Sequence, residues 1–521
     1  MADAAAPRRI IAATALVALA CAVFVPSVWA GFLSDDFLLL TNLHHGGVGW
    51  VFSHNDIGEA GAAGHFYRPF WVLWNLWLFR AFGSSATAFH VANLVLYSVL
   101  VLEVLALLAT FVDAARAWIA AAAFAVYPRH GESVAWVSGN TDLVAVTVAL
   151  AALLIVRSRA SFAVRIAGAA ALTAVATLSK EIAFTLPVLA LLVLRRRDDR
   201  RELLIPATML LVELGTFAAR YAVIGGLGGY SQFSWTPRSL LGSFGSYVLA
   251  SGIPPSIPAF RYEAVFLLPV ALLGLVVWRV LVLWRREAFE DVRLVAVGAA
   301  WFVVALLPLG SLPVDLNNAN GERNLMLASV GLALAFAGLI PRPRRAWAGA
   351  AAGAAICALA ALTLYNSFDW IEAGRLAKRL VPAAAAMTPR GGELILLSQP
   401  EGFRTAHVFI GGDLSREFRY HGITDRVASF CAPVELRAVR SGEVSFRPVA
   451  GSYHGASGWS APFDFPVLHS AGGLTGECSY ARLPGTPERP GLGVRVRATP
   501  TPSGRPVVYA YFDGRDFRRC C

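Results

Sequence analysis

Long apolar segments recur through the first 366 residues of this chain, and they restrict its fold more than any other feature. A helix that crosses a bilayer needs about 20 mostly apolar residues. The composition agrees, because 56% of the residues are hydrophobic and only 15% are charged, against about 25% charged in soluble globular proteins. We therefore expect a mainly α, polytopic membrane protein of about 11 transmembrane helices. The expected spans are residues 10–30, 86–112, 116–128, 140–156, 163–179, 182–194, 203–223, 264–284, 294–312, 325–340 and 346–366.

Basic residues predict the orientation of these helices. Arg8 and Arg9 precede the first span, which indicates a signal anchor with its N-terminus in the cytoplasm. A signal peptide cleaved near residues 28–30 is the alternative. The Arg run 195–197 and Arg285-Arg286 fall on the same side, so the topology accounts for the net charge of +11 and leaves no patch for nucleic acid. The preference for Ala and Arg indicates a bacterial inner membrane.

Two shorter segments do not fit as spans. Residues 240–257 are expected to form a re-entrant or interfacial helix, because a crossing there would place Arg285-Arg286 outside. Aromatic residues between positions 70 and 79 are spaced as in a helix that lies in the membrane interface.

The composition changes after Tyr365 to a polar stretch rich in Gly and Pro. This change divides the chain into a transmembrane catalytic domain, 1–366, and an extracytoplasmic domain, 367–521, which is expected to be periplasmic and α/β or β-rich. Runs at 393–397, 444–449 and 507–512 are the expected strands. Outside the cytoplasm Cys431 could pair with Cys478, and free thiols are the equal alternative.

Polar residues gather in the loops expected on the outer face. Asp35-Asp36 follows the first span directly, and two adjacent carboxylates there can supply a general base, bind a cation or mark a helix end. Tyr67-Arg68 precedes the aromatic stretch, where an arginine that anchors an aromatic belt is the alternative to a catalytic role. His130 and Glu132 lie in the second outer loop.

Two further outer clusters carry cations. Lys180 and Lys378 are the only lysines in a chain with 45 Lys and Arg, so a lysine at the membrane edge suggests a compact ammonium that binds phosphate. An ion pair between Lys180 and Glu181 is the alternative. Glu322-Arg323 begins a later span, where a guanidinium can bind phosphate through two hydrogen bonds.

These clusters follow one another in an order that resembles the membrane core of GT-C glycosyltransferases over roughly residues 9–366. Within that superfamily the chain is most similar to protein O-mannosyltransferase relatives in which transmembrane helices precede TPR repeats. The TPR repeats are absent here. The ordered series is Asp35-Asp36, Tyr67-Arg68-Pro69, 89–94, 124–139, 178–181 and 322–325.

The resemblance implies an inverting transfer of a sugar from a polyprenyl-phosphate carrier to an acceptor hydroxyl at the outer membrane face. It implies that Asp35 and Asp36 supply the catalytic base. Cations near the phosphate would stabilise the charge that grows on it, and we assign Lys180 and Arg323 to that role, with Arg68 third. The expected substrate-positioning residues are Tyr67, His130, Glu132, Glu181 and Glu322. The acceptor is left open as a glycan, a lipid or a protein.

No metal-ligand spacing is present, although Asp35, Asp36 and Glu132 could together hold a divalent cation. A transporter or flippase for lipid-linked saccharides would place charges at the membrane midplane rather than at one edge. A non-catalytic, glycan-binding scaffold is the third hypothesis. The base hypothesis requires Asp35 to share one chamber with Lys180 and Arg323.

Overall fold

The computed structural model divides the chain into two units. The helical unit comprises Met1–Val28, Val48–Asp56 and Phe66–Ser367, and the strand unit comprises Trp29–Gly47, Ile57–His65 and Phe368–Cys521. The residues that the structure describes are 5–54, 64–194, 199–226, 228–230, 236–255, 267–316, 320–341, 346–409, 413–436, 438–442, 444–457, 477–483, 493–499 and 504–520.

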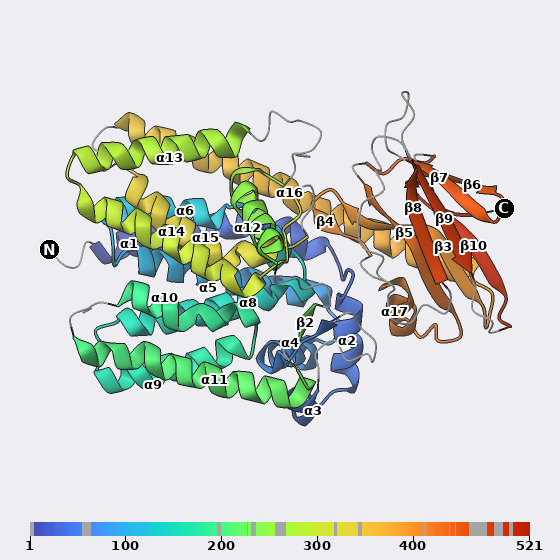
Figure 1. Ribbon diagram of the computed structural model, residues 1–521, viewed down its shortest axis with the longest axis horizontal. Coiled ribbons are helices and arrows are strands. Elements are labelled where there is room, and N and C mark those ends of the chain that lie inside the picture. The colour runs from blue at the N-terminus through green and yellow to red at the C-terminus, as the bar shows by residue number, and fades with distance from the viewer. Residues whose placement is uncertain are drawn as a thin grey trace. The chain divides into compact units, whose positions relative to one another are not determined.

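The helical unit contains long apolar helices that lie against one another (Figure 1). Its helices are α1 (Ala5–Phe24), α3 (Val48–Ser53), α4 (Pro69–Phe82), α5 (Ala86–Leu108), α6 (Ala114–Ala125), α7 (Gly131–Ala135), α8 (Thr141–Arg157), α9 (Phe162–Thr177), α10 (Leu186–Val193), α11 (Leu204–Ile224), α12 (Pro237–Gly252), α13 (Leu267–Arg285), α14 (Phe289–Leu306), α15 (Leu325–Leu339) and the first part of α16 (Ala346–Met387). The two-residue strand β2 (Gly229–Tyr230) also belongs to this unit.

Every expected span coincides with a helix. Among the described residues eight helical segments are long and apolar enough to cross a membrane. Three shorter apolar helices, Ala114–Ala125, Phe162–Thr177 and Glu181–Val193, occupy the remaining expected positions. The eight long segments are Ile10–Trp29, Ala86–Leu108, Ser138–Arg157, Arg200–Ile224, Leu267–Arg285, Phe289–Leu309, Glu322–Leu339 and Gly349–Met387. The prediction of a mainly helical chain with several candidate spans is confirmed. The two shorter segments around residues 70–79 and 240–257 also form helices, α4 and α12.

Small residues let some of these helices approach closely. A Cβ on Gly298 of α14 would lie 2.5 Å from the carbonyl oxygen of Gly331 in α15, and one on Gly331 would lie 2.6 Å from the carbonyl oxygen of Gly298. Close backbone approach at small residues stabilises helix pairs in lipid, where burial of apolar surface contributes little.

The last helix extends beyond its expected end at residue 366, because α16 continues to Met387. Trp370, Ala373, Ala377, Leu380 and Ala384 are buried in this continuation at spacings of three and four residues. Such spacing forms an apolar stripe along one helix face. The change to polar composition therefore does not mark the helix end, since a helix with one buried face contains many polar residues.

The strand unit is built around two sheets (Figure 1). One five-stranded sheet has the order β11 (Phe517–Arg519), β10 (Val507–Phe512), β3 (Glu393–Phe403) and β4 (Ala406–His407), and β5 (Val427–Leu436) also pairs with β3. Strands β10, β3 and β5 run parallel. Leu394 to Leu397 are all buried, as in a parallel strand that is covered on both faces.

The second sheet is antiparallel, with the order β6 (Val444–Val449), β7 (Ser452–Ser457), β9 (Gly493–Thr499) and β8 (Glu477–Leu483). Aromatic rings join it to the first sheet, with Phe446 and Tyr511 5.7 Å apart between ring centroids. The predicted strand-containing C-terminal region is confirmed, and β6 and β10 have the bounds that the sequence predicts.

Several short segments complete the strand unit, namely α2 (Asp36–His45), α17 (Asp413–Tyr420) and β1 (Gly64–His65). The segment Trp29–Gly47, which the sequence analysis assigned to domain 1–366, belongs here. Its backbone approaches α16 closely, because a Cβ on Gly374 would lie 2.8 Å from the carbonyl carbon of Ala30.

Cys431, on β5, is disulfide-bonded, whereas Cys21 and Cys357 are free. The side chain of Cys478 lies outside the described residues, so its pairing with Cys431 stays a prediction.

Candidate functional site

The two adjacent acids at the start of α2 have different surroundings. Asp36 is buried, and its Oδ2 accepts a hydrogen bond from the backbone N–H of Leu33 at 2.9 Å. The Asp36 N–H in turn donates to the Leu33 carbonyl at 3.0 Å. Between them Ser34 has a φ of +54°, in the left-handed region that non-glycine residues rarely adopt. Asp36 therefore stabilises the tight turn into the helix.

Asp35 is more accessible, with 42% of its side chain exposed. Its Oδ1 accepts a hydrogen bond from Arg416 Nη1 of α17 at 2.9 Å. A general base must reach the proton that it takes. By its exposure Asp35 suits that role better than Asp36.

Lys180 lies directly before the short 3-10 helix Glu181–Thr185, and its Nζ contacts Asp142 Oδ2. Asp142 is in the first turn of α8, where the helix dipole favours a carboxylate. The other oxygen, Asp142 Oδ1, is buried without a hydrogen-bond partner among the described residues. Burial, together with the nearby charges of Arg323 and Arg68, lowers the pKa of Lys180 to about 8 despite the opposite charge of Asp142.

Glu181 pairs with two arginines rather than with Lys180. Arg68 Nη2 lies 2.9 Å from Glu181 Oε2, and Arg220 of α11 contacts Glu181 Oε1. The Arg68 guanidinium also lies over the Phe66 ring, 4.1 Å from its centroid. The alternative in which Lys180 and Glu181 form an ion pair is wrong, because the two neighbouring side chains reach different partners.

Glu132, in α7, is buried and holds the start of α15. Its Oε1 is 2.8 Å from Arg323 Nη1, and its Oε2 accepts the Arg323 backbone N–H at 2.8 Å. A tight turn follows α7, since a Cβ on Gly139 would collide with the Glu132 carbonyl oxygen. Arg323 is 17% exposed and lies over Trp136, 5.2 Å from the ring centroid. Its guanidinium is therefore fixed but still reachable.

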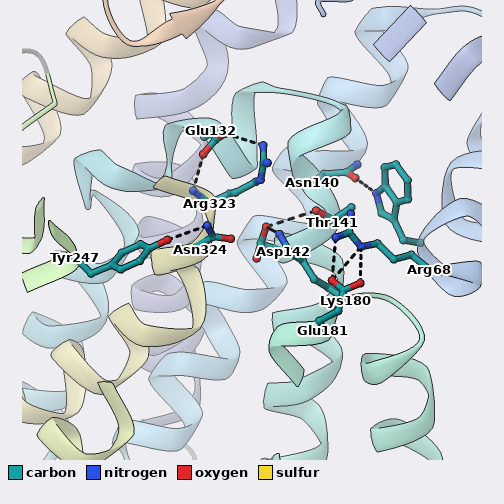
Figure 2. A network of polar contacts seen from close by, with 11 residues as sticks. Arg68, Glu132, Asn140, Thr141, Asp142, Lys180, Glu181, Tyr247, Arg323 and Asn324 are labelled. Atoms are coloured by element: carbon teal, nitrogen blue, oxygen red, sulfur yellow. Dashed lines mark hydrogen bonds and ion pairs between the residues drawn. The ribbon is translucent and has the colours of Figure 1, made fainter. Parts of the chain in front are cut away.

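The paired cations gather in one place (Figure 2). Arg68, Lys180 and Arg323 lie around Asp142, with Glu132 and Glu181 at the two sides. We call these residues together with Arg220 the cation cluster. Four cations (Arg68, Lys180, Arg220 and Arg323) face three carboxylates (Glu132, Asp142 and Glu181). Cations therefore outnumber carboxylates by one among these seven side chains.

The remaining predicted residues are occupied by protein contacts. Tyr67 donates its hydroxyl to the Phe52 carbonyl at 3.0 Å. His130 contacts the Tyr97 hydroxyl at 2.8 Å and the Ser329 hydroxyl at 2.9 Å, and burial lowers its pKa to about 3. The ring is thus neutral, and both its nitrogens are engaged.

Glu322 is also buried, with Oε1 2.6 Å from Arg129 Nη1. Arg129 donates in addition to the Ile253 carbonyl, at 2.7 Å. The ion pair between Arg129 and Glu322 connects the second outer loop to the start of α15.

Sequence reasoning did not identify which residues pair with the predicted side chains, namely Asp142 with Lys180, Arg220 with Glu181 and Arg129 with Glu322. It also missed Asn140, which accepts a hydrogen bond from Trp71 Nε1 at 2.5 Å and donates to Asn93 at 2.8 Å. A signal existed for Asp142, because a buried lysine needs a carboxylate. The choice of carboxylate depends on helix packing.

No three His, Cys, Asp or Glu side chains within the described part of the chain come together as metal ligands would. Asp36 and Glu132 both accept hydrogen bonds from backbone N–H groups. Asp35 and the cation cluster belong to different units, so their proximity stays a prediction.

No known family model matches the chain, and no curated protein is significantly similar to it. Solved structures of ArnT from Cupriavidus metallidurans are similar in part. The form bound to undecaprenyl phosphate has 14% identity and a TM-score of 0.46, over 74% of this chain and 82% of that chain. The apo form has 15% identity and a TM-score of 0.36, over 75% of this chain and 83% of that chain. At TM-scores below 0.5 the likeness decides nothing about function, which has to be argued from the residues.

Proposed function

We propose that this protein is an inverting glycosyltransferase of the GT-C type. It moves a sugar from a polyprenyl-phosphate carrier to an acceptor hydroxyl on the outer face of a bacterial inner membrane. The cation cluster is the observation that carries the proposal. A sugar linked to polyprenyl phosphate is a phosphodiester with one negative charge, and the four cations of the cluster would attract it.

The chemistry needs a base and an anion site. The Asp35 carboxylate takes the proton of the acceptor hydroxyl while the hydroxyl oxygen forms a bond to the anomeric carbon. The bond from that carbon to the phosphate oxygen breaks, and its electron pair leaves with the polyprenyl phosphate. A single displacement inverts the anomeric configuration.

The leaving phosphate gains a second negative charge in this step. Lys180 and the guanidinium groups of Arg68 and Arg323 stabilise that growing charge. Their carboxylate partners hold the cations in place before the donor binds, so little reorganisation is needed. Because Asp142 Oδ1 is buried without a partner among the described residues, it could also accept a hydrogen bond from a donor sugar hydroxyl.

The test is turnover of a polyprenyl-phosphate-linked sugar by the purified protein, measured as release of polyprenyl phosphate. We expect Lys180→Gln to weaken donor binding, because a charge-assisted contact to phosphate is lost. Lys378→Gln is the matched control, since Lys378 is the other lysine and is exposed on α16. Equal donor affinity in the two variants would remove Lys180 from the donor site. Absence of turnover in wild-type protein with a panel of such donors would contradict the proposed function.

A further inference from the structure

Helix α17 joins the C-terminal sheet to the segment that carries the acid pair. Leu414 and Phe418 are buried on one side of the helix. The Ser415 hydroxyl donates to the Ala428 carbonyl of β5 and accepts the Ala428 N–H at 2.8 Å. These contacts fix α17 on β5 of the five-stranded sheet.

Another side of α17 contacts α2. The Phe37 ring lies edge-on to Tyr420, with 5.4 Å between ring centroids, and 6.1 Å from His421. Such aromatic pairs add to the stability of an apolar contact. The start of α2 is thereby held against a helix more than 370 residues later in the chain.

Arg416 lies within this contact. Its Nη1 is 2.9 Å from Asp35 Oδ1, and its side chain is 16% exposed while that of Asp35 is 42% exposed. The cation is thus mostly covered by protein, whereas the carboxylate faces outward. A guanidinium that holds one carboxylate oxygen restricts rotation of the group and leaves the other oxygen, Oδ2, outside this contact.

We propose that Arg416 is a positioning residue for the catalytic base, and that the C-terminal domain is for this reason part of the catalytic apparatus. The inference rests on the proposed function, in which Asp35 takes the acceptor proton. A base has to lie within about 2.6–3.2 Å of the proton donor. Misplacement of a reacting group by about 1 Å can lower the rate about 100-fold.

The experiment compares Arg416→Gln, Arg416→Lys and Arg419→Gln in the full-length protein, with release of polyprenyl phosphate as the readout. Arg419 is exposed on the same helix and serves as the control. We expect Arg416→Gln to lower kcat about 10- to 100-fold without a change in the KM for the donor. Arg416→Lys should recover part of the loss, since an ammonium can still contact the carboxylate, and Arg419→Gln should behave as wild type.

A double variant separates positioning from a general loss of structure. Because Arg416 acts through Asp35, Arg416→Gln should cause no further loss in an Asp35→Asn background. Multiplied losses would overturn the inference, as would an unchanged kcat or an increased donor KM in Arg416→Gln.

Hydrogen exchange provides a measurement that is independent of turnover. Amides of residues 33–39 should exchange faster in Arg416→Gln than in Arg419→Gln. Equal exchange would overturn the positioning role. If wild-type protein turns over no polyprenyl-phosphate sugar, the proposed function fails, and the exchange experiment still decides whether Arg416 fixes this segment.

Discussion

Asp35 and Lys180 are held in the protein in opposite ways. Asp35 is 42% exposed and contacts Arg416, whereas Lys180 is 8% exposed and lies among carboxylates and arginines from several helices. An exposed carboxylate can meet a substrate that arrives from water. A buried cation acts in a medium of lower dielectric constant, where its attraction for phosphate is stronger. Exposure suits a proton acceptor, and burial suits an anion site.

The largest effect is expected at the exposed acid. Asp35→Asn keeps the shape of the side chain but removes the base, so turnover should fall by about 10²- to 10⁴-fold. Unfolding temperature should change little, because exposed ion pairs contribute about 0–1 kcal/mol. Polyprenyl phosphate release and thermal unfolding measure the two properties.

Asp36→Asn is the matched comparison for this variant. Asp36 accepts a hydrogen bond within the turn, and the uncharged amide oxygen of Asn should accept it more weakly, so the main effect should be a loss of stability of about 1 kcal/mol. A larger loss of turnover in Asp36→Asn than in Asp35→Asn would reverse the assignment of the base.

The next largest effect is expected in the cation cluster. Asp142→Asn leaves Lys180 buried without its carboxylate, and removal of one member of a buried pair costs about 3–5 kcal/mol. Thermal unfolding of the purified protein measures the loss. The double variant Asp142→Asn with Lys180→Gln should be more stable than Asp142→Asn alone, because no buried charge is left unpaired. If the double variant is no more stable than Asp142→Asn alone, the charge of Lys180 does not need Asp142 for its stabilisation.

The helices of this protein could be predicted from sequence because each apolar span is a local pattern. The bounds of β6 and β10 follow from equally local runs. The continuation of α16 could not be predicted by composition, since its apolar stripe packs within a polar domain. Local patterns therefore predicted which helices and strands form more accurately than where those elements end.

The site could be predicted only in part. The scarcity of lysine singled out Lys180, yet its partner Asp142 lies 38 residues earlier, and Arg416 lies 381 residues after Asp35. Such pairs are set by how helices pack, and no spacing in the sequence encodes them. The cations and the acids Glu132 and Glu181 were recognisable as residue types, whereas the pairing of each cation with its carboxylate emerged only from the three-dimensional arrangement.

The smallest expected effect that distinguishes the Lys180 site from the Asp35 site is a dependence on pH. Burial lowers the pKa of Lys180 from 10.5 to about 8, so the ammonium loses its charge as pH rises through that value. The kcat/KM for the donor reports ionisation of the free enzyme. It should therefore fall above pH 8, by up to about tenfold per pH unit, because neutral Lys180 no longer attracts the phosphate. Lys180→Gln should show a lower value without this decline, and Lys378→Gln should retain it. A wild-type profile that stays level well above pH 8 would show that the charge of Lys180 does not contribute to donor capture, and would leave that role to Arg68 and Arg323.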